Sequence, residues 1–191
     1  MKIAIYTLGC KVNQYESQAM EQALRARGHA VVPFAEEADA YIVNTCSVTA
    51  VSDQKSRQVI HGIQRKHPGA VVAVCGCYSQ THVDDVRKLG VDLIAGTGDR
   101  TGFIRLLEET AAEKRRIEAI DQPFERRVFE VLPAGGLEGR TRAMLKVEDG
   151  CVNFCSYCII PYARGRIRSL PLEAAAEQAA RLAEEIGRAH V

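Results

Sequence analysis

The sequence lacks any long apolar run and any excess of charge of one sign. Its longest apolar runs, such as residues 70–75, are far too short to cross a bilayer. No A-x-A-like cleavage site follows the short apolar run in the N-terminal MKIAIYTLGC, so this segment is expected to be a buried first strand rather than a secretory signal. We therefore expect a cytoplasmic protein that makes no membrane contact.

The near-zero net charge of +1 creates no global field that would attract nucleic acid. Any contact with RNA must come from local basic clusters. One cluster consists of Arg164, Arg166 and Arg168, and another combines residues 114–116 with Arg126 and Arg127. A run of charge is usually a solvated face, which is our interpretation of the second cluster. The first adjoins a candidate reactive centre, so we expect it to face RNA.

The 191 residues suffice for one full domain and part of another, and 47% apolar with 26% charged residues is typical of an ordered globular chain. Short apolar runs alternate with amphipathic stretches, which predicts an α/β fold with a doubly wound, flavodoxin- or Rossmann-like parallel sheet. The predicted strands are residues 2–8, 29–34, 39–46, 70–76 and 91–96, and the predicted helices are residues 12–27, 47–66, 82–89 and 99–113.

We expect three segments along the chain. Residues 1–112 form the α/β domain. Residues 113–139 form a linker with Pro123, a Gly-Gly turn and room for a hairpin. Residues 140–191 contain a strand at 142–150, a loop and a helix after Pro171. One such β/α unit cannot bury its apolar faces alone, so this second domain is expected to be incomplete.

Seven cysteines in a cytosolic chain favour metal ligation over disulfides. Three of them, Cys151, Cys155 and Cys158, are spaced C-x3-C-x2-C on one loop. Three thiolates can hold three irons of a [4Fe–4S] cluster and leave the fourth iron open. Structural zinc, the alternative, usually needs four ligands, and no fourth Cys or His lies nearby.

Three further cysteines, Cys10, Cys46 and Cys77, each follow a predicted strand. The carboxyl ends of parallel strands share one edge of a sheet, so these residues could converge on a second three-thiolate site. Alternatively, each is an ordinary buried cysteine. Cys75 lies one step deeper in its strand, and we expect it in the core, with its side chain on the same face as that of Cys77.

Four stretches carry a family resemblance: TLGCKVNQYES, NTCSVTAVSDQKSRQ, GCYSQ and KVEDGCVNFCSYCIIPYARGR. Together they resemble the methylthiotransferases of the radical S-adenosylmethionine (SAM) superfamily, and are most like the branch that modifies N6-threonylcarbamoyladenosine at tRNA position 37. The resemblance implies insertion of a methylthio group at C2 of this adenine, with a 5′-deoxyadenosyl radical as the agent. It also implies tRNA as substrate and an electron donor such as flavodoxin or ferredoxin, and we expect a monomer.

The same resemblance implies two [4Fe–4S] clusters, with SAM bound to one of them. Cys151, Cys155 and Cys158 would hold the SAM cluster, and Cys10, Cys46 and Cys77 an auxiliary one. Tyr157 would lie along the adenine of SAM, unless it only packs within the loop. Four polar residues could donate to cluster sulfurs or serve as ordinary strand-end and cap residues: Asn13, Asn44, Thr45 and Gln80.

Three other functions stay open. They are methylthiolation of isopentenyladenosine in tRNA, a non-enzymatic iron–sulfur redox sensor, and a zinc-stapled RNA-binding module.

The family pattern continues through further β/α units and an RNA-binding domain that this sequence does not include. Its last residues, EIGRAHV (185–191), match what a common sequencing adapter encodes. Our hypothesis is a truncated gene model, and the alternative is a natural helix end capped at Gly187. As a truncated fragment, the chain is expected to bind clusters poorly protected from solvent and to show no turnover.

Overall fold

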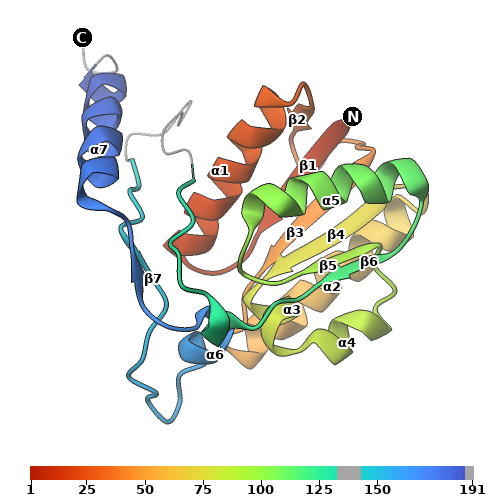
Figure 1. The fold of residues 1–191 in the computed structure, drawn as a ribbon. Helices are drawn as coiled ribbons and strands as arrows, with labels where there is room; N and C mark the ends of the chain where they lie inside the picture. The colour runs from red at the N-terminus through yellow and green to blue at the C-terminus, as the bar shows by residue number, and fades with distance from the viewer. Residues whose placement is uncertain (133–142, 188–191) are drawn as a thin grey trace.

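The computed structural model describes residues 1–132 and 143–187 (Figure 1). The N-terminal part contains a six-stranded sheet, and the C-terminal part a two-stranded one. The elements of the first part are β1 (Lys2–Thr7), α1 (Lys11–Ala26), β2 (Ala30–Val32), β3 (Ala40–Thr45), α2 (Ala50–Lys66), β4 (Val71–Gly76), α3 (Cys77–Thr81), α4 (Val83–Lys88), β5 (Leu93–Ala95), α5 (Arg100–Glu113) and β6 (Ile117–Ala119). Those that follow are the 3-10 helix η1 (Pro123–Glu125), β7 (Glu148–Asp149), α6 (Ile160–Arg164), β8 (Arg168–Ser169) and α7 (Leu172–Gly187).

The large sheet is parallel throughout, in the order β2-β1-β3-β4-β5-β6. Its central strand β3 is buried along its full length, as expected for a parallel strand covered on both faces. The order of the first five strands is that of flavodoxin-like sheets. The predicted doubly wound α/β fold is therefore confirmed.

Alternate residues of each strand enter two different cores, as the pleat of a strand requires. Ile3 and Ile42 pack with α1 and α5 on one face, whereas Ala4 and Tyr41 pack with α2 and α4 on the other. Figure 1 shows α1 and α5 together on one side of the sheet and α2 on the opposite side.

Two short elements of the N-terminal part were not predicted. Residues 117–119, within the expected linker, form β6 and pair with β5, so the sheet extends beyond residue 112. The five-residue helix α3 begins directly at Cys77. Both are too short to leave a recognisable period in the sequence. The division into three segments stays a prediction, and the Gly-Gly turn lies outside the described residues.

The strand predicted at 142–150 is reduced to β7, which pairs antiparallel with β8. A strand forms only where a neighbouring strand pairs with its backbone N–H and C=O groups. Because β8 is two residues long, only two residues of the predicted strand are paired. Residues 143–145 instead pack with Tyr15, Leu132 and Leu182, which attaches α7 to the N-terminal part. Across the described ranges, no helix is long and apolar enough to cross a membrane.

Candidate metal centre

Three cysteines lie where adjacent strands of the large sheet end. Cys10 is the residue before α1 on the connection from β1, Cys46 follows β3 directly, and Cys77 follows β4 as the first residue of α3. Because β1, β3 and β4 are neighbours, all three residues occupy one edge of the sheet, as predicted. Cys46 and Cys77 are buried and Cys10 is exposed.

The three residues are near one another but do not form a closed triad of ligands. A Cβ atom added to Gly9 would lie 2.6 Å from Sγ of Cys46, so the residue before Cys10 touches Cys46. The charges of Cys10 and Cys46 act on the pKa of Cys77. Within residues 1–132 and 143–187, no three His, Cys, Asp or Glu side chains are arranged to hold a metal ion. The ligand role of these cysteines stays a prediction.

Gly76 makes the turn from β4 into Cys77 possible. Its φ of +102° lies in a region that L side chains rarely adopt, and a Cβ atom there would lie 2.4 Å from the carbonyl oxygen of Thr45. The turn also ends the strand before Cys77. The alternation of side chains along a strand therefore does not extend from Cys75 to Cys77. Our inference from this alternation, that both side chains lie on one face, is wrong.

Cys75 itself packs in the core beside α1 and α5, as predicted. Burial raises the pKa of Cys75 to about 11, and it likewise raises the pKa of Cys77 to about 11, although the charge of Arg164 acts against the shift at Cys77. Without a metal, both thiols are thus protonated at neutral pH. Binding of a metal by Cys77 would release a proton.

The cysteine loop lies on the second segment. The backbone N–H of Cys151 donates to the carbonyl of Gly165 at 3.0 Å, and that of Cys158 donates to the carbonyl of Cys155 at 2.9 Å. Cys155 is exposed, while Cys151 and Cys158 are half-buried. Tyr157 is 90% exposed, so the alternative that it packs within the loop is wrong, and its contact with SAM stays a prediction.

The helix that follows this loop docks on the sheet edge. α6 packs against α3, and the Thr97 hydroxyl donates to the carbonyl of Ala163 at 2.6 Å. Arg164, the last residue of α6, is buried and donates to Oδ1 of Asn13 at 2.9 Å and to Oε1 of Glu16 at 2.7 Å. The helix that follows one group of cysteines is thus in direct contact with elements that carry the other group.

Glu16 is the centre of a buried ion network. Its carboxylate also accepts from Arg100 at 2.9 Å and from Lys146 at 2.9 Å. Burial by itself would raise the pKa of Glu16, but the charges of Arg164, Arg100 and Lys146 outweigh it and hold this pKa well below its usual value. Asp149 extends the network, because it pairs with Lys146, Arg164 and Arg168.

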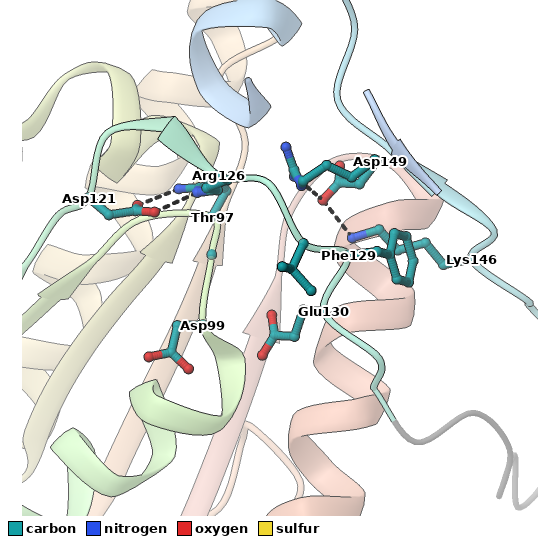
Figure 2. Close-up of a pocket in the computed structure, with 11 residues that line it drawn as sticks. Thr97, Asp99, Asp121, Arg126, Phe129, Glu130, Lys146 and Asp149 are labelled. Atoms are coloured by element: carbon teal, nitrogen blue, oxygen red, sulfur yellow. Dashed lines mark hydrogen bonds and ion pairs between the residues drawn. The ribbon is translucent and has the colours of Figure 1, made fainter. Parts of the chain in front are cut away.

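A polar cavity of about 140 Å³ adjoins this network (Figure 2). Figure 2 shows the Lys146 ammonium directed at Asp149, with Phe129 beside Lys146 and the Arg126–Asp121 pair on the other side. Both acidic and basic groups line the cavity, so it presents no single sign of charge to a ligand.

The network corrects our expectation about RNA contact. Arg164 and Arg168 are buried and paired with carboxylates, and only Arg166 of that cluster is exposed. Their sequence pattern could not reveal the distant carboxylate of Glu16. In the second cluster, Arg115 pairs with Glu113 and Arg126 with Asp121. Arg115 and Arg127 are exposed, as the expected solvated face requires, but Arg126 is only 12% exposed and lines the polar cavity, so that expectation is wrong for Arg126.

The four polar residues near the cysteines have structural partners. Asn13 donates to the carbonyls of Leu8 and Thr45, and Asn44 donates to the carbonyl of Asn13. The Thr45 hydroxyl donates to the carbonyl of Cys75, and Gln80 donates to the carbonyl of Asp121. These contacts favour the interpretation as strand-end and cap residues. The Sγ atom of Cys10 lies 3.8 Å from the accepting Oδ1 atom of Asn13.

Fold and site together define a class of protein: a flavodoxin-like α/β domain with cysteines at the carboxyl edge of its sheet, joined to a second cysteine loop. Residues 2–96 match the family described as "Uncharacterized protein family UPF0004".

Over nearly its whole length the chain is similar to tRNA methylthiotransferases, which confirms the resemblance that the four motifs predicted. It is 41% identical to "Threonylcarbamoyladenosine tRNA methylthiotransferase MtaB" of Bacillus subtilis over 95% of this chain and 41% of that protein. The protein of the same name from Aquifex aeolicus is 37% identical over 97% of this chain and 45% of that protein. A "tRNA-2-methylthio-N(6)-dimethylallyladenosine synthase" of Pelotomaculum thermopropionicum is 31% identical over 96% of this chain and 42% of that protein. The chain thus spans less than half the length of these relatives.

Among solved structures, the isolated REC domain of RcsB from Salmonella enterica matches with a TM-score of 0.47 and 13% identity, over 62% of this chain and 92% of that one. This likeness is too slight to support a conclusion about the chain.

Proposed function

We propose that the chain carries the cysteine-bearing part of a radical SAM tRNA methylthiotransferase that acts at C2 of N6-threonylcarbamoyladenosine 37. The observation that supports this most is the direct contact between α6, which follows the C-x3-C-x2-C loop, and the sheet edge that bears the other three cysteines. The similarity to a threonylcarbamoyladenosine tRNA methylthiotransferase over 95% of the chain supports the same substrate.

In this proposal Cys151, Cys155 and Cys158 hold a [4Fe–4S] cluster with SAM at its open iron, and Tyr157 lies along the adenine of SAM. An auxiliary [4Fe–4S] cluster is held by Cys10, Cys46 and Cys77. When bound, these cofactors supply the radical and the sulfur that insertion at an unactivated C–H bond requires.

The donor set fits such clusters. Each group offers three soft thiolates, which is the ligand type that iron–sulfur clusters take, and leaves one position free for an exogenous ligand. Structural zinc wants four protein ligands. Two of the three sheet-edge cysteines are shielded from water, because Cys46 is 3% and Cys77 is 2% exposed, whereas Cys10 is exposed.

The protein's own residues place the two groups. The turns at Gly9 and Gly76 carry Cys10 and Cys77 to the edge of the sheet, and the bonds from Thr97 and Arg164 fix α6 against it. We further propose that the protein acts in the cytoplasm and receives electrons from a flavodoxin or ferredoxin.

Anaerobic reconstitution of the chain with iron and sulfide tests the cofactors. We expect about eight irons per chain and a spectrum that changes when SAM is added. About four irons without a response to SAM would favour the redox sensor, and zinc without iron would favour the zinc-stapled module.

Analysis of tRNA nucleosides tests the substrate. Cells that lack the gene should lose methylthio-threonylcarbamoyladenosine, and the complete gene should restore it. The 31% identity to a dimethylallyladenosine synthase supports that nucleoside as a second candidate. Loss of its methylthio derivative instead would establish the second candidate and refute the first.

A further inference from the structure

Arg164 links the two groups of cysteines through one side chain. It lies at the end of the helix that follows Cys158, and its guanidinium reaches the first turns of α1, the helix that begins beside Cys10. One nitrogen donates to Asn13 at 2.9 Å and the other to Glu16 at 2.7 Å. Asn13 in turn contacts Sγ of Cys10, so a short chain of contacts leads from the loop to the sheet edge.

The network that holds Arg164 has more positive than negative charge. Its members are joined by ion pairs, and every side chain is at most 10% exposed. Its two carboxylates are Glu16 and Asp149, and its cations are Arg100, Lys146, Arg164 and Arg168. Asp121 acts on Arg168 and Glu130 on Arg100, but among the described ion pairs Arg164 has only Glu16 and Asp149. A buried charge is costly unless an opposite charge compensates it, so further negative charge beside Arg164 would be favourable.

The sheet-edge cysteines can provide it. α3, which begins at Cys77, packs against α6, which ends at Arg164. The charges of Arg164 and Cys77 act on each other's pKa, which is consistent with this proximity. A cysteine that binds a metal does so as the anionic thiolate.

We propose that Arg164 is a positioning residue that fixes the cysteine loop to the sheet edge and whose buried positive charge raises the reduction potential of the cluster at Cys10, Cys46 and Cys77. The physical reason is that a fixed positive charge stabilises the reduced cluster, which carries one more negative charge, over the oxidised one. This inference rests on the proposed function.

The test uses the whole chain with Cys151, Cys155 and Cys158 replaced by Ala, so that only the sheet-edge cluster can form. After anaerobic reconstitution with iron and sulfide, iron is counted and the cluster is titrated with reductant under EPR detection. The variants are Arg164→Gln, which removes the charge, Arg164→Lys, which keeps the charge but not the two-pronged contact, and Arg166→Gln. Arg166 is the matched control, because it is an exposed arginine two positions along the chain.

We expect Arg164→Gln to bind about four irons per chain and to shift the reduction potential to a more negative value. Arg166→Gln should leave the potential unchanged, and Arg164→Lys should bring it back toward the original. Equal potentials for Arg164→Gln and Arg166→Gln would overturn the inference while leaving the proposed cluster in place. Failure of the background chain to bind any iron would refute the proposed cluster, and the inference with it.

If Arg164→Gln does not fold, hydrogen exchange of the Arg164→Lys variant tests the positioning role. We expect backbone amides of residues 151–158 to exchange faster than in Arg166→Gln, because lysine lacks the planar fork whose two nitrogens bond Glu16 and Asn13 separately. Equal exchange in the two variants would overturn that role.

Discussion

Replacing Glu16 by Gln is expected to destabilise the chain strongly. The substitution keeps the shape of the side chain but removes the carboxylate that Arg100, Lys146 and Arg164 share. Breaking a buried pair typically costs about 3–5 kcal/mol, because an uncompensated charge stays behind. In the Glu16→Gln variant, Arg100 retains only the carbonyl of Gly96 among its described partners. The other two cations, Lys146 and Arg164, still pair with Asp149, which limits the loss. We therefore expect the lower end, about 3 kcal/mol.

Urea denaturation of the cluster-free chain measures this loss, with linear extrapolation to zero denaturant. The matched control is Glu21→Gln on the same helix. Glu21 pairs with Arg25 on the surface, where the two side chains are 35% and 48% exposed. Its loss should change the free energy of unfolding by at most about 0.5 kcal/mol. Similar effects for the two variants would refute the idea that the Glu16 network stabilises the fold.

The effect of Glu16 should also depend on pH. The neighbouring cations lower its pKa in the folded protein, against burial, so the carboxylate stabilises the fold fully above its unfolded pKa near 4.5. That contribution is lost as pH falls through the folded pKa. The difference in unfolding free energy between the original chain and Glu16→Gln should therefore narrow in acid. A constant difference from pH 7 to pH 3 would contradict the assigned shift.

Four further substitutions test the site and its scaffold. Gly76→Ala should destabilise the chain by about 1–3 kcal/mol in urea, since its Cβ would lie 2.4 Å from the Thr45 carbonyl. Gly62→Ala, on a helix with nothing within 4 Å of the new Cβ, should instead stabilise the chain by about 0.5–1 kcal/mol. If the two glycine variants changed the free energy of unfolding in the same direction, this explanation would be wrong. Asp99→Ala removes the side chain that accepts from the Gly102 N–H at 2.8 Å at the start of α5, so we expect a loss of about 1 kcal/mol, and no loss would show that this cap is unimportant. Cys10→Ala should lower the iron content after reconstitution by about four per chain and preserve the response to SAM, whereas loss of that response would show that the two cysteine groups are misassigned.

The sequence alone predicted the parts of the fold that depend on local pattern. The apolar run of β4 and the amphipathic period of α1 are long enough to specify their elements. The rule that parallel strands end at one edge then placed Cys10, Cys46 and Cys77 together, although their ligand role remains a prediction. The family resemblance came from ordered motifs, which are also local.

Only the tertiary structure decided the rest, because it depends on contacts between residues far apart in the chain. The sequence presents Arg164 and Arg168 as part of a basic run, and folding buries them against Glu16 and Asp149. β6 and α3 are too short to have a period, and they exist because β5 and the sheet edge offer them partners. Charge and apolar pattern are properties of the sequence, but whether a charge faces water or a buried carboxylate depends on what the fold places opposite it.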